Sequence, residues 1–70
     1  MSQSRLMVPE MSCEACRTTV AGALERIEGV EAVEVDLDAK LVTVRHGGHV
    51  SQDALIGAVE EQGYEVAEAA

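Results

Sequence analysis

A strand hairpin in the middle of the chain limits the folds that the rest of this sequence can adopt. Residues 30–37 alternate between apolar and mostly acidic side chains, as in a strand with one buried and one wet face. A tight turn at 38–40 leads into a second apolar run at 41–45, so the two runs are predicted to pair antiparallel. The apolar face of such a hairpin needs a second layer to cover it.

Helical periodicity on both sides of the hairpin predicts that layer. Apolar side chains recur at three- and four-residue spacing over 15–27, and Gly29 is predicted to end this helix as a left-handed cap. A second stripe occupies 55–62. Ser51 is its expected N-cap and Gly63 its expected end.

The two ends of the chain are predicted to supply the outer pair of strands. Residues 4–9 read as a first strand that stops at Pro9, and residues 64–67 as a short last strand before a frayed tail at 68–70. The resulting βαββαβ order predicts an α+β, ferredoxin-like fold. It is a four-stranded antiparallel sheet with two helices on one face.

This topology predicts which loops meet. The Cys loop is the segment 10–14, which holds Cys13 and leads to Cys16. Tracing the strand directions puts this loop, the turn around Asp38 and the junction at 63–64 at one end of the molecule. The two histidines, in the loop 46–49, fall at the other end, roughly 15–20 Å away. We therefore expect His46 and His49 to lie in a solvated loop without a metal role.

Length and composition bound the fold to one small domain over 1–70, with its core at about 4–67. The sequence is 47% hydrophobic but only 1% aromatic, so its core must be aliphatic. It contains no run of about 18 apolar residues and begins without an apolar signal segment. We expect a cytoplasmic protein that does not insert into membranes.

The net charge of −8 restricts the partners. Nucleic acid and anionic membrane surfaces attract basic proteins, so neither is an expected partner. A basic patch on another protein remains compatible with this charge. The acidic residues are equally explained as keeping a small protein soluble.

Both cysteines, Cys13 and Cys16, lie between the first strand and the first helix. Cys16 is expected at or near the helix N-terminus, where the helix dipole favours thiolate over thiol. In the cytoplasm, a Cys-x-x-Cys pair indicates metal binding or redox exchange rather than a structural disulfide.

The number of ligands favours a soft metal. Structural zinc requires four ligands, whereas this chain offers two sulfurs. Thiolates select Cu(I), and Hg(II) fits the same two-sulfur geometry. Thiol-disulfide oxidoreductase chemistry stays open as an alternative, although no aromatic residue or proline follows the cysteines closely on the helix side.

Three motifs together resemble the heavy-metal-associated domain family. They are Met-x-Cys-x-x-Cys at 11–16, Gly-Val-x-x-Val-x-Val at 29–35 and Gly-Tyr-x-Val at 63–66. The resemblance covers residues 4–67 and implies a ferredoxin-like fold. Members of this family occur as bacterial copper chaperones and as N-terminal metal-binding domains of copper-transporting P-type ATPases.

The resemblance also implies roles for individual residues. Cys13 and Cys16 would bind Cu(I), Met11 would be a buried tether under the loop, and Tyr64 would lie beside the metal, as in bacterial chaperones of the family. Ser12 favours copper, because zinc-exporting relatives often carry Asp there. Mercury-binding relatives share Ser or Thr at this position, but they are exported.

One position departs from the family pattern. Glu10 occupies the place where relatives usually carry Gly before the Met. Its side chain is expected to stiffen the start of the loop or to place a carboxylate near the site. Arg17 follows Cys16 directly and is expected either to offset the charge of a bis-thiolate complex or to be a solvated helix residue.

These observations predict a cytosolic Cu(I) metallochaperone with no catalytic residues. It would pass copper by thiolate exchange to a copper-transporting P-type ATPase or its metal-binding domain, or to a copper-responsive regulator. The sequence is also compatible with an excised ATPase domain or with a Zn(II) or Hg(II) handler, although the initiating Met favours a free protein. We expect a monomer without metal and a metal-bridged homodimer as a further form.

Overall fold

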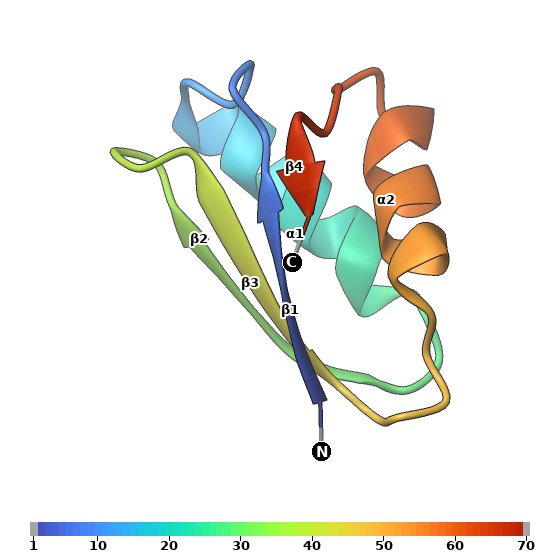
Figure 1. Ribbon diagram of the computed structural model, residues 1–70. Coiled ribbons are helices and arrows are strands. Elements are labelled where there is room, and N and C mark those ends of the chain that lie inside the picture. The colour runs from blue at the N-terminus through green and yellow to red at the C-terminus, as the bar shows by residue number, and fades with distance from the viewer. Residues whose placement is uncertain (1, 70) are drawn as a thin grey trace.

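The computed structural model describes residues 2–69 and confirms the predicted α+β order (Figure 1). Two helices pack on one face of a four-stranded antiparallel sheet, whose strands lie in the order β2-β3-β1-β4. The elements are β1 (Ser2–Met7), α1 (Glu14–Glu25), β2 (Val30–Asp36), β3 (Leu41–His46), α2 (Gln52–Glu61) and β4 (Glu68–Ala69).

The core lies between the sheet and the two helices and is aliphatic, as the composition predicts. The inward-facing positions alternate along β1 and β3, and the register places Leu6 opposite Val42. The same row continues to Val35 of β2. Buried hydrophobic residues come from every layer and from the Cys loop: Leu6, Val8, Met11, Val20, Ala23, Leu24, Val42, Val44, Leu55 and Val59.

The structure confirms the predicted ends of the second helix but not the predicted end of the first. Ser51 caps α2, with its Oγ accepting a hydrogen bond from the Ala54 N–H at 3.2 Å. Gly63 follows the end of α2 with a φ of +91°. The expectation for Gly29 is wrong, because α1 already ends at Glu25 and Gly29 turns the chain into β2 instead.

The prediction for the last strand is also wrong. Residues 64–67 form no regular element, and the strand is the segment 68–69 that was expected to fray. Pairing with β1 begins only where the Ala67 N–H donates to the Met7 carbonyl at 2.8 Å. Before that point Tyr64 and Val66 pack against the core as the chain crosses from α2. Ala70 lies outside the described residues.

The first strand is shifted relative to the prediction of 4–9, because β1 runs over 2–7. Val8 leaves the strand but stays fully buried. Its N–H donates to the carbonyl of Lys40 at 2.9 Å, which keeps the end of β1 attached to the β2–β3 turn.

His46 contradicts the expectation of a solvated loop. It is the last residue of β3, and only 4% of its surface is exposed. Its Nδ1 donates to the carbonyl of Gly47 at 2.8 Å, so Nε2 accepts from the hydroxyl of Ser4 at 2.9 Å. His49 is exposed, as predicted.

The loops are distributed between the two ends of the molecule as the topology predicts. The Cys loop, the β2–β3 turn and the α2–β4 connection gather at the top of Figure 1. His46 pairs with Ser2 and Val30 at the opposite end of the sheet. Within residues 2–69, no helix has the length and apolar character needed to cross a membrane.

Candidate metal site

The two thiols lie at the start of α1. Cys13 is the N-cap residue and is exposed, whereas Cys16 lies in the first turn, half-buried against the core. Residues three apart on a helix share a face, so the two sulfurs come within 3.1 Å of each other. The Arg17 N–H donates to the Cys13 carbonyl at 3.0 Å and closes this turn. Both cysteines are free thiols.

Met11 anchors the Cys loop to the hydrophobic core. Its side chain is fully buried in the core, and its N–H donates to the Val8 carbonyl at 3.1 Å. Ser12, directly after it, is exposed. The loop is therefore anchored to the core by one side chain while its cysteine-bearing part faces solvent.

Tyr64 approaches the same site from the α2–β4 connection. The pKa of Cys16 is lowered from 9.0 to about 7, and the side-chain hydrogen bond with Tyr64 is the largest cause. The Cys13 thiol and the backbone at Ser12 contribute to the same fall in pKa. The same contact with Cys16 raises the pKa of Tyr64. Tyr64 also packs on the core, so it both covers the core and reaches a sulfur.

Arg17 is paired with an acid of its own helix. Its Nη2 lies 2.7 Å and its Nε 2.8 Å from Oε2 of Glu14. Both side chains are largely exposed, at 45% for Arg17 and 73% for Glu14. The guanidinium therefore faces solvent beside the loop and already shares its charge with Glu14.

Glu10 places a carboxylate at this end of the molecule, which was one of the two effects expected of its side chain. Its Oε1 accepts a hydrogen bond from the backbone N–H of Glu65 at 3.0 Å. The bond joins the start of the Cys loop to the segment that carries Tyr64. Glu10 is thus engaged with the neighbouring backbone.

An acidic hollow of about 630 Å³ adjoins the start of α1. It runs between Glu14 and the β2–β3 hairpin, where Glu34, Asp36 and Asp38 line it.

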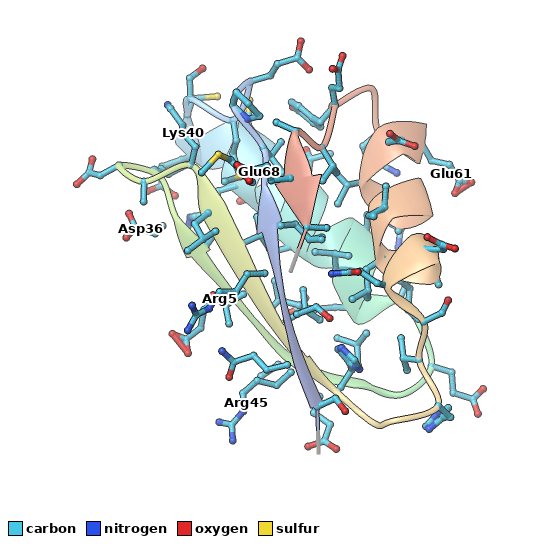
Figure 2. The ribbon with its side chains drawn as sticks, in the orientation of Figure 1. Arg5, Asp36, Lys40, Arg45, Glu61 and Glu68 are labelled. Carbon is cyan, nitrogen blue, oxygen red and sulfur yellow. The ribbon has the colours of Figure 1, made fainter. Side chains whose placement is uncertain are left out.

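Figure 2 shows Asp36 on the hairpin, Lys40 at the turn, and Arg5 and Arg45 farther down the sheet, pointing away from the helices.

The donor set at the site consists of two sulfurs. Among residues 2–69, no three or more His, Cys, Asp and Glu side chains come together in a way that would hold a metal ion. A closed four-ligand zinc centre therefore does not form within this part of the chain. Two adjacent thiols, one with a lowered pKa, suit a soft ion of low coordination number.

Comparison with known proteins agrees with this geometry. Residues 5–65 match the family described as the heavy-metal-associated domain. The chain belongs to this family. A similar curated member is the copper chaperone CopZ of Staphylococcus epidermidis, which is 42% identical over 67 residues, covering 94% of this chain and 98% of the relative.

Solved structures of family members share the fold. A structure of a CopZ metallochaperone superposes with a TM-score of 0.89 at 38% identity, covering 93% of this chain and 98% of that one. Oxidised MerP from Ralstonia metallidurans CH34 superposes with a TM-score of 0.86 at 31% identity, covering 96% and 97%. Both similarities span nearly the whole chain.

Proposed function

We propose that this protein is a cytosolic Cu(I) metallochaperone in which Cys13 and Cys16 bind the ion as thiolates. The main support for this proposal is the pair of free thiols, whose sulfur atoms lie 3.1 Å apart at an exposed helix start. The pKa of Cys16 near 7 supports it, because a substantial share of this thiol is ionised at neutral pH. Similarity to the CopZ chaperones supports copper as the cargo.

Loading requires a local movement of the sulfurs. Two in-line metal–thiolate bonds, taken at the about 2.3 Å of zinc–thiolate bonds, put the sulfurs about 4.6 Å apart, so the sulfurs must separate by about 1.5 Å. Cys13 is the residue placed to move, because it is exposed and its side chain makes no helix-capping hydrogen bond. Cys16 stays packed against the core.

Transfer would proceed by ligand exchange. A thiolate of the acceptor attacks the bound Cu(I), giving a three-coordinate intermediate, and one of the two resident thiolates then leaves. The exposed Cys13 is the accessible leaving ligand. The acceptor would be a copper-transporting P-type ATPase or its metal-binding domain, and the acidic hollow beside Glu14 favours an acceptor with a basic surface.

An anaerobic competition experiment tests the proposal. The reduced protein is titrated with Cu(I) against a chromogenic chelator, with Zn(II) and Hg(II) titrated in parallel. Cys13→Ser and Cys16→Ser should each abolish competition for Cu(I), whereas Ser12→Ala, a matched change between them, should not. A preference for Zn(II) or Hg(II) would refute the Cu(I) assignment, and full Cu(I) affinity in Cys16→Ser would refute binding by two thiolates.

A further inference from the structure

The segment that carries Tyr64 has little regular structure of its own to hold it. Residues 64–67 form neither helix nor strand. At one end the segment leaves α2 through Gly63, whose N–H donates to the Glu60 carbonyl at 2.9 Å. At the other end it is held by the bond from the Ala67 N–H to Met7. Tyr64 and Glu65 lie between these two attachments.

Glu10 supplies an attachment in the middle of this segment. Its Oε1 lies 3.0 Å from the N–H of Glu65, a residue 55 positions away in the sequence. A carboxylate acceptor forms a stronger hydrogen bond with a backbone amide than a neutral acceptor does. The residue next to Tyr64 is therefore bonded to the residue next to Met11.

The other side of this bond is rigid. Met11 is fully buried, and its N–H is bonded to Val8, which is in turn bonded to Lys40 in the β2–β3 turn. The backbone at Glu10 is therefore held in place both by the core and by the β2–β3 hairpin. The hydrogen bond from Glu10 therefore restrains the Tyr64–Glu65 segment, because the Glu10 side of the bond is already fixed.

We propose that Glu10 is a positioning residue whose carboxylate fastens the Tyr64–Glu65 segment to the start of the Cys loop and so holds the Tyr64 side chain beside Cys16. With the tyrosine held there, an incoming chelator or thiolate has restricted access to the half-buried sulfur. Glu10 then acts on the exchange rate through Tyr64. The structural part of this inference stands independently of the metal, and the part on exchange rests on the proposed Cu(I) function.

Two variants separate the hydrogen bond from the charge. Glu10→Gln keeps a side-chain oxygen that accepts from the Glu65 N–H but loses the negative charge, whereas Glu10→Ala loses both. Glu60→Ala is the matched control, because Glu60 lies by Gly63, Tyr64 and Glu65 without a side-chain hydrogen bond to this segment. Glu10 is exposed, so the substitutions leave the core intact.

The first measurement uses the reduced protein without metal. In ¹⁵N NMR spectra, Glu10→Ala should exchange the Glu65 amide with water about fivefold faster and weaken the nuclear Overhauser contacts between the Tyr64 ring and Cys16. Glu10→Gln, whose neutral oxygen forms a weaker bond, should lie between Glu10→Ala and the unmodified protein. Glu60→Ala should match the unmodified protein. Unchanged exchange and contacts in Glu10→Ala, or loss of both in Glu10→Gln, would overturn the positioning role.

The second measurement follows release of Cu(I) to excess chelator by stopped flow. Glu10→Ala should release the ion about fivefold faster, and this effect should fall below twofold when Tyr64 is already replaced by Ala, which removes the ring that restricts access. An equal effect in both backgrounds would show that Glu10 does not act through Tyr64. If the unmodified protein fails to bind Cu(I), the proposed function fails while the amide-exchange result still decides the positioning role.

Discussion

Replacing Met11 tests how far the conformation of the Cys loop depends on the hydrophobic core. Met11→Ala removes roughly three methylene-sized groups from a fully buried side chain, at about 0.8 kcal/mol each. The cavity left behind adds on the order of 1 kcal/mol, for a total loss in unfolding free energy of about 3 kcal/mol. A domain of this size has roughly 4–10 kcal/mol of stability, so the variant should still fold.

Urea unfolding measures this loss. With a dependence of about 1 kcal/mol per molar urea, Met11→Ala should lower the midpoint by about 3 M. Met11→Leu nearly conserves volume and should cost less than about 1.5 kcal/mol. Met7→Ala is the matched control, because Met7 is 36% exposed and its truncation should change stability little. Equal midpoints for Met11→Ala and Met7→Ala would refute the view that Met11 ties the loop to the core.

Further predictions concern the site and one helix cap. Tyr64→Phe should return the pKa of Cys16 from about 7 toward 9.0, seen as a shifted thiolate absorbance titration; an unshifted curve would contradict the assigned cause. Because the native pKa of Cys16 is the lower one, stability of the metal-free protein should rise between pH 7 and pH 9 and decline as pH falls through 7. Urea midpoints should show this slope, and Cys16→Ser should flatten it. Ser12→Asp adds an oxygen ligand and should raise Zn(II) affinity about tenfold in the chelator competition, and an unchanged affinity would speak against this ligand position. Ser51→Ala should cost about 1 kcal/mol in urea unfolding, with Ser12→Ala, at an exposed loop position, near zero.

Local periodicity was sufficient to predict the middle of the fold. The alternation in β2 and β3 and the helical stripes of α1 and α2 report burial within a few residues of sequence, so they predict element type and facing. The same alternation also indicates that His46 is buried, which the prediction of a solvated loop overlooked. Val42 and Val44 face inward, and the next inward position is His46.

The ends of the chain depend on contacts between distant segments. The position of β4 is decided by where the crossing segment first meets β1, at the bond from Ala67 to Met7, which no local pattern contains. At the site, the Cys-x-x-Cys spacing predicted the adjacent thiols. The bond from Glu10 to Glu65 spans 55 positions and lay beyond sequence reasoning, and the side-chain hydrogen bond with Tyr64 is the largest cause of the lowered pKa of Cys16.

The placement of Tyr64 makes the protein its own optical reporter. The sequence contains no Trp, no Phe and a single Tyr, so its ultraviolet emission comes from this one ring. Its hydroxyl contacts Cys16, so ionisation of this thiol, disulfide formation or binding of the proposed Cu(I) would each change the surroundings of the hydroxyl. Oxidation of the two thiols, and the proposed loading and transfer of Cu(I), should therefore be observable in unlabelled protein, against no background from any other aromatic side chain.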